Sequence, residues 1–116
     1  MTKFLLIQPQ AALGTWAPAD VERHFAYQLR LDADLEAAGE LVETQGLAGQ
    51  SRLVTSDGTG EPAVDARGLP PLAGYRIVDV ESEERALQIA ARASAAPGPG
   101  GVPLRQPIDV RRVLSP

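Results

Sequence analysis

The stretch Leu72–Arg92, LAGYRIVDVESEERALQIAAR, predicts a buried strand that runs directly into an amphipathic helix. Tyr75–Val80 is dense in β-branched and aromatic residues, with apolar side chains at both alternating sets of positions. We therefore expect a central strand that is covered on both faces. Ser82 is a suitable N-cap for the helix that follows. Mostly small side chains at helical spacing predict the face that packs on a sheet: Ala86, Ile89, Ala90 and Ala93.

Shorter patterns on either side of this stretch supply the remaining elements. Lys3–Gln8 predicts a first strand, and Val21–Ala38 predicts a helix that Gly39 ends. Further predicted strands are Glu40–Thr44, Ser51–Ser56, a short edge strand at Pro62–Asp65, and Ile108–Leu114, with a hairpin turn at Asp57–Gly60. The order predicts one ferredoxin-like α+β domain over residues 1–116, an antiparallel sheet with both helices on one face. The other face of such a sheet would leave apolar side chains exposed to water. We therefore predict a homodimer in which the sheets of two copies pack against each other.

Composition argues against several classes of function. The formal net charge of −4 disfavours nucleic-acid binding, which requires a basic surface. With one histidine and no cysteine, a zinc site of the usual ligand types is not expected, and we predict no cofactor. No apolar run reaches the length of a membrane span and no targeting leader opens the chain, so the expected location is the cytoplasm.

Three polar residues interrupt the apolar face of the predicted first helix. The apolar arc that should face the sheet consists of Val21, Phe25, Tyr27, Leu29, Leu31 and Leu35. His24, Gln28 and Asp32 lie within this arc at spacing i, i+4, i+8, which aligns them over about 12 Å of helix. Because buried polar groups need partners or water, this row predicts a polar pocket between the helix and the sheet.

Two interpretations of this row remain open. In the first, His24 is a general base with Asp32 assisting it, because an imidazole can exchange a proton near neutral pH. In the second, His24 binds a backbone carbonyl or water, and Asp32 forms a structural ion pair with an arginine. The arginines available for that pair are Arg76, Arg105 and Arg112.

Other residues could complete a pocket for a small organic acid or a ring compound. Gln28 could act as a hydrogen-bonding spacer, and Arg76 could bind the ligand. Trp16 and Tyr27 could form walls for a flat apolar molecule, although aromatic residues near the start of a helix also serve as core or interface.

Several stretches resemble the YCII-related family, including its DGPF-domain branch. They are KFLLI (3–7), AAGELVETQGL (37–47), the strand–helix stretch quoted above, and APGPGGVPLRQPIDVRRV (96–113). The resemblance implies a dimeric α+β barrel and a lyase-like reaction with a His/Asp acid–base pair, here His24 and Asp32. It also implies, as an alternative, a non-catalytic dimer with a regulatory role beside sigma factors of the extracytoplasmic type.

The chain departs from the family pattern in two places. Asp65–Leu69 occupies the position of the Asp-Gly-Pro-Phe signature, which is absent. His24 lies about one helical turn before the usual histidine position of the family, and Gln28 holds that position.

Overall fold

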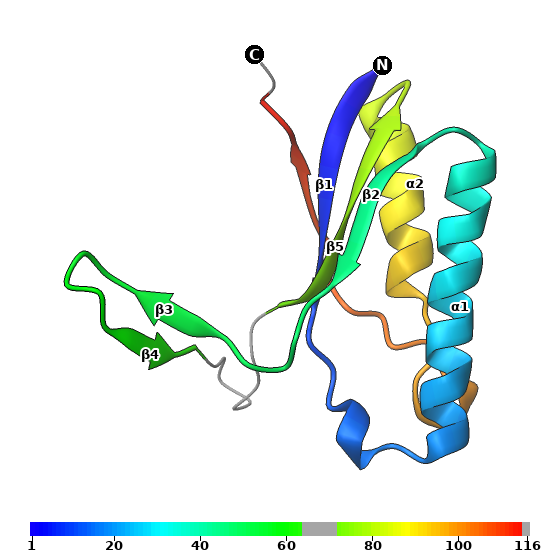
Figure 1. The fold of residues 1–116 in the computed structure, drawn as a ribbon. Coiled ribbons are helices and arrows are strands. Elements are labelled where there is room, and N and C mark those ends of the chain that lie inside the picture. Colours follow the sequence, from blue (N-terminus) through cyan, green and yellow to red (C-terminus); the bar gives the residue numbers. More distant parts are fainter. Residues whose placement is uncertain (64–71, 115–116) are drawn as a thin grey trace.

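The computed structural model describes residues 1–63 and 72–114, which form a layer of helices on a layer of strands (Figure 1). The main sheet contains β1 (Thr2–Pro9), β2 (Leu41–Gly46), β5 (Leu72–Val80) and β6 (Asp109–Arg112). The helices are α1 (Pro18–Ala37) and α2 (Glu83–Ser94), with single 3-10 turns η1 (Leu13–Thr15) and η2 (Pro99–Gly101). A separate hairpin is formed by β3 (Arg52–Val54) and β4 (Gly60–Pro62).

The four strands of the main sheet are antiparallel and lie in the order β2-β5-β1-β6. Both helices cover the same face of this sheet, and the β3–β4 hairpin projects as an arm on the other side (Figure 1). Gly74 lets β2 and β5 approach closely, because a Cβ there would lie 2.6 Å from the carbonyl oxygen of Gln45. The predicted α+β class is confirmed, and the strand order is compatible with a ferredoxin-like arrangement.

The hydrophobic core fills the space between the helices and the sheet. It consists of Phe4, Leu6, Leu31, Leu35, Val78, Val80, Ala86, Ile89, Ala90 and Ala93. The predicted packing face of α2 is thereby confirmed. Small side chains on this face let the helix lie close to the strands, so the strand–helix stretch forms the centre of the fold.

Polar contacts fix the start of α2. Ser82 is the N-cap, and its hydroxyl accepts a hydrogen bond of 3.1 Å from the amide of Arg85. The Arg85 guanidinium binds both carboxylate oxygens of Glu40, at 2.8 and 2.9 Å, just after Gly39 ends α1 in a left-handed conformation. These hydrogen bonds hold the pKa of Glu40 below its usual value. The end of α1 and the start of α2 are therefore joined by a charged pair.

Part of the predicted packing of the first helix is wrong. Phe25 and Leu29 were expected to face the sheet, but they are 49% and 69% exposed. Leu31 and Leu35 do lie in the core. The difference arises because Phe25 and Leu29 line a cavity beneath the middle of α1, whereas Leu31 and Leu35 pack into the core.

The central strand is also covered differently from the expectation. Within this chain the helices cover one face of β5, while Tyr75 and Ile77 are half-buried on the opposite face.

Neither helix of the described chain has a segment long and apolar enough to span a bilayer.

The predicted hairpin turn is confirmed. Asp57 Oδ1 accepts hydrogen bonds from the Thr55 hydroxyl and from the amide and hydroxyl of Thr59, and Gly58 has a positive φ of 82°. The second strand of the hairpin is Gly60–Pro62, earlier than expected. The last two residues of the predicted edge strand, and the whole of Asp65–Leu69, lie outside the described residues.

Candidate functional site

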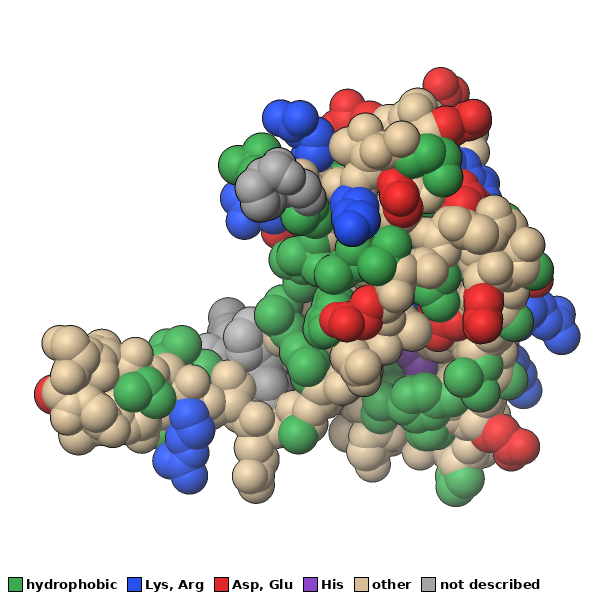
Figure 2. All heavy atoms as spheres, turned by 45° about the horizontal axis from the view of Figure 1, so that its top comes forward, with side chains coloured by type: hydrophobic (Ala, Val, Ile, Leu, Met, Phe, Trp, Pro, Cys, Tyr) green, Lys and Arg blue, Asp and Glu red, His purple; other side chains and the backbone are tan. Residues whose placement is uncertain are grey.

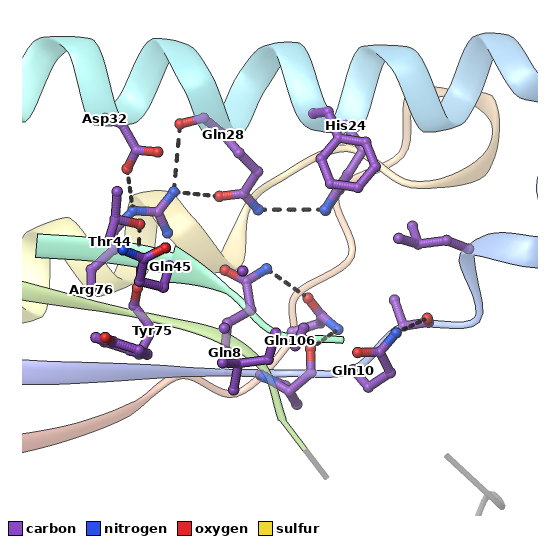
Figure 3. Close-up of a pocket in the computed structure, with 18 of the residues that line it drawn as sticks. Gln8, Gln10, His24, Gln28, Asp32, Thr44, Gln45, Tyr75, Arg76 and Gln106 are labelled. Carbon is purple, nitrogen blue, oxygen red and sulfur yellow. Dashed lines mark hydrogen bonds and ion pairs between the residues drawn. The ribbon is translucent and has the colours of Figure 1, made fainter. Parts of the chain in front are cut away.

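A cavity of about 310 Å³ lies between the middle of α1 (residues 24–32) and the neighbouring ends of β1, β2 and β5 (Figure 3). Its polar lining includes Gln8, Gln10, His24, Gln28, Asp32, Thr44, Gln45, Arg76 and Gln106. Its apolar lining includes Leu13, Phe25, Leu29, Leu47 and Ala73. His24, the single histidine, is visible at the bottom of a hollow in the surface (Figure 2). A mixed lining of this size is typical of sites for small molecules.

The polar row of α1 faces the sheet, where Arg76 of β5 joins it. Arg76 Nε donates to Asp32 Oδ1 at 2.7 Å, and Nη2 donates to Gln28 Oε1 at 2.6 Å. Arg76 is 7% exposed, so its charge depends on these partners. The two contacts come from one rigid helix and hold the guanidinium in a fixed orientation.

The hydrogen bonds of His24 define its tautomer. Nδ1 lies 3.0 Å from the carbonyl oxygen of Pro97, which can only accept, so Nδ1 carries the proton. In the neutral ring Nε2 then carries the lone pair, and it faces the Gln28 carboxamide nitrogen at 3.4 Å (Figure 3). Trp16 and Phe25 contact the ring edge-on, each with ring centroids at 5.5 Å. Together these contacts fix the orientation of a histidine that is 5% exposed.

A pair of glutamines lines another wall of the cavity. Gln106 Nε2 donates to the Pro9 carbonyl oxygen at 3.2 Å, which sets the orientation of this carboxamide. Its Oε1 therefore accepts from Gln8 Nε2, also at 3.2 Å. Ser94 further fixes Gln106 by donating to its backbone carbonyl at 2.6 Å. The carboxamide oxygen of Gln8 remains without a partner among the residues that the structure describes.

Two residues that the sequence suggests for ligand binding lie outside the cavity lining. The Tyr27 hydroxyl donates to the Arg92 carbonyl oxygen at 2.7 Å, so Tyr27 connects α1 to α2. Trp16 supports the His24 ring from outside the cavity. The other candidates, His24, Gln28, Asp32 and Arg76, all line it together.

Sequence reasoning missed the two glutamines that form the second polar wall. Gln8 had a usable signal, because it alternates with Phe4 and Leu6 and so lies on their face of the strand. A polar residue at the end of an apolar row marks the point where the core gives way to a cavity. Gln106 follows a proline- and glycine-rich loop and had no periodic signal.

Tyr75 of β5 and Glu43 of β2 lie on adjacent strands of the sheet. The Tyr75 hydroxyl donates to a carboxylate oxygen of Glu43, and this hydrogen bond raises the pKa of Tyr75 above its usual value. Tyr75 therefore stays protonated at neutral pH and acts here as a hydrogen-bond donor to Glu43.

The cavity offers hydrogen-bonding groups rather than a set of metal ligands. Within residues 1–63 and 72–114, no cluster of three or more His, Asp or Glu side chains could hold a metal ion.

A scan against models of known protein families matches none of them, and a search of the curated proteins finds no relative of this chain.

Proposed function

We propose that this chain binds a small organic acid in the cavity and transfers a proton on it through His24, as a lyase or isomerase. The observation that carries the proposal is the tautomer of His24. Its Nδ1 hydrogen is held by the Pro97 carbonyl, which leaves the Nε2 lone pair on the side of Gln28, a residue that lines the cavity. A general base needs such an oriented lone pair within reach of the ligand. At 3.4 Å, the contact with Gln28 is long enough for a ligand to replace.

In this proposal Arg76 binds the carboxylate of the ligand. Its Nε and Nη2 are held by Asp32 and Gln28, and Nη1 has no partner within the described part of the chain. Asp32 is then a positioning residue for Arg76 rather than an acid–base partner of His24. Because Asp32 balances the charge of Arg76, we expect modest affinities, with binding detectable at millimolar ligand.

Benzoate is expected to raise the melting temperature of the protein at millimolar concentration, whereas benzamide of the same shape is not. A ligand that binds only the native state must stabilise it. Arg76→Lys keeps a cation beside Asp32 but removes the planar donors, and a charged hydrogen bond of about 1.5–3 kcal/mol corresponds to at least tenfold weaker binding. The measurement is differential scanning fluorimetry over a ligand titration.

Arg92→Lys is the matched control, because Arg92 binds Asp34 outside the cavity. Equal stabilisation by benzoate and benzamide would contradict a carboxylate site. So would a benzoate affinity that Arg76→Lys leaves unchanged.

The second candidate function is a non-catalytic, ligand-binding or regulatory dimer. A specific observation favours it, because hydrogen bonds link neighbouring polar groups of the chain into one continuous row. The row consists of Asp32, Arg76, Gln28, His24 and the Pro97 carbonyl. Such a network can stabilise the fold without any chemistry. The regulatory role that the YCII-related resemblance implies belongs to this candidate.

The open face of the sheet supports the dimer in either case. Leu5 lies opposite Ile77, and Ile7 opposite Tyr75, on the face without helices, and all four are half-buried in the single chain. Hydrophobic side chains also gather on the side of the molecule from which the arm projects (Figure 2). We propose that a second copy covers this face, as the homodimer of a dimeric α+β barrel would.

The wild-type protein is expected to sediment at twice the chain mass of 12.3 kDa, because the apolar face of the sheet would otherwise be exposed to water. Ile77→Asp is expected to give a folded monomer. Leu87→Asp, at an exposed position of α2, is the control and should leave the dimer intact. A wild-type protein that sediments as a monomer at micromolar concentration would contradict the assembly.

A further inference from the structure

Glutamines are concentrated at the cavity. The sequence has seven, and five of them line it: Gln8, Gln10, Gln28, Gln45 and Gln106. Carboxamides are neutral and offer both donors and acceptors, so they suit a neutral polar group of a ligand rather than a second charge. The wall formed by Gln8 and Gln106 is separate from the Arg76 group, since no hydrogen bond among the described residues joins the two.

The Gln8 carboxamide is held with its oxygen available. Its nitrogen donates to Gln106, whose own orientation is set by the Pro9 carbonyl. Neither carboxamide can flip without losing a hydrogen bond, so Gln8 Oε1 is a preorganised acceptor. It requires a donor from the ligand, such as a hydroxyl group.

The sheet register places this acceptor at a distance from Arg76. Leu6 is the partner of Arg76 and Gln8 is the partner of Gly74, and both β1 residues are on the helix-facing side. Two strand positions correspond to about 7 Å. A ligand that reaches both groups therefore carries its hydroxyl well away from its carboxylate. The apolar lining, which includes Phe25, Leu29 and Leu47, suits a ring between them.

We propose that the substrate class is a ring carboxylate with a hydroxyl group remote from the carboxylate, and that Gln8 determines this specificity. The proposal rests on the proposed function, because it assumes that Arg76 binds the carboxylate. Gln8 Oε1 accepts the hydrogen bond from the hydroxyl group. A ligand without that hydroxyl would cover this acceptor and displace its water while offering no partner, which weakens binding.

The test compares benzoate, 4-hydroxybenzoate and 2-hydroxybenzoate by isothermal titration calorimetry. The wild-type protein is expected to bind 4-hydroxybenzoate about tenfold more tightly than benzoate, the gain of one good hydrogen bond. 2-Hydroxybenzoate is expected to show no such gain, since its hydroxyl lies beside the carboxylate. Gln8→Met, of similar size, should lose the preference for the 4-hydroxyl and bind benzoate at least as tightly as the wild type does, because the Gln8 acceptor that benzoate would leave without a partner is then absent.

Two further variants make the result specific. Gln8→Glu keeps an acceptor oxygen but loses the donor that binds Gln106 and adds a charge, so both ligands should bind more weakly while 4-hydroxybenzoate stays the tighter of the two. Gln50→Met changes an exposed glutamine outside the cavity and should change nothing. The role of Gln8 would be overturned if 2-hydroxybenzoate gained as much affinity over benzoate as 4-hydroxybenzoate does. It would also be overturned if Gln8→Met kept the preference for 4-hydroxybenzoate.

The outcome also separates this inference from the proposed function. If benzoate binds through Arg76 but Gln8→Met leaves the ligand ratio unchanged, the specificity proposal alone fails. If none of the three carboxylates binds the wild-type protein, the carboxylate site fails and the specificity proposal fails with it.

Discussion

Asp32→Ala is expected to lower the free energy of unfolding by about 3 kcal/mol, the lower end of the range for breaking a buried ion pair. The Arg76 side chain is buried and would keep its charge with Gln28 as its remaining partner. An uncompensated buried cation is unfavourable because the surrounding protein solvates it poorly. The measurement is urea unfolding followed by circular dichroism, with the slope checked for two-state behaviour.

Asp34→Ala is the matched control on the same helix. Asp34 also binds an arginine, Arg92, but both side chains of that pair are exposed, so its loss should change stability by less than about 1 kcal/mol. The double variant Asp32→Leu/Arg76→Met removes both charges and is expected to recover most of the loss. Equal effects of Asp32→Ala and Asp34→Ala would contradict the structural importance assigned to the buried pair.

The sequence was sufficient for the polar row of α1 but not for its partner in the sheet. Helical spacing alone aligns His24, Gln28 and Asp32. Arg76 alternates with Val78 and Val80, so its face of the strand was known, but both faces of that strand are apolar. Which face meets the helices depends on the topology of the whole sheet, and that decides between Arg76 and the other arginines.

Long-range loop contacts were beyond sequence reasoning. The partner of His24 Nδ1 is Pro97, 73 residues away, and Gln106 meets Gln8 across 98 residues. Both come from the irregular segment after α2, where no periodicity predicts the path of the chain. The expected burial of Phe25 and Leu29 was wrong for a related reason. A helical wheel treats the apolar arc as uniform, whereas part of that arc in α1 lines a cavity and part of it packs into the core.

His24→Asn is expected to slow proton transfer on a bound ligand by about 10²–10⁴-fold, the usual contribution of a general base. The asparagine carboxamide nitrogen can occupy the place of the ring Nδ1 and keep the hydrogen bond to Pro97, while the Nε2 lone pair is lost. Suitable probes are ketone-bearing carboxylates such as 4-oxopentanoate and 4-oxocyclohexanecarboxylate. Exchange of the hydrogens beside the ketone in D₂O, followed by proton NMR, measures the transfer directly.

Ligand affinity separates a lost base from a damaged cavity. In the proposed function Arg76, held by Asp32 and Gln28, binds the carboxylate and His24 does not. His24→Asn should therefore retain benzoate binding while exchange is lost. His24→Ala removes the Pro97 contact as well and should lower the melting temperature further. If bound ketocarboxylates exchange equally fast with His24→Asn, Nε2 is not the base. If the wild-type protein binds them without accelerating exchange, the hydrogen-bonded row serves binding alone, which is the second candidate function.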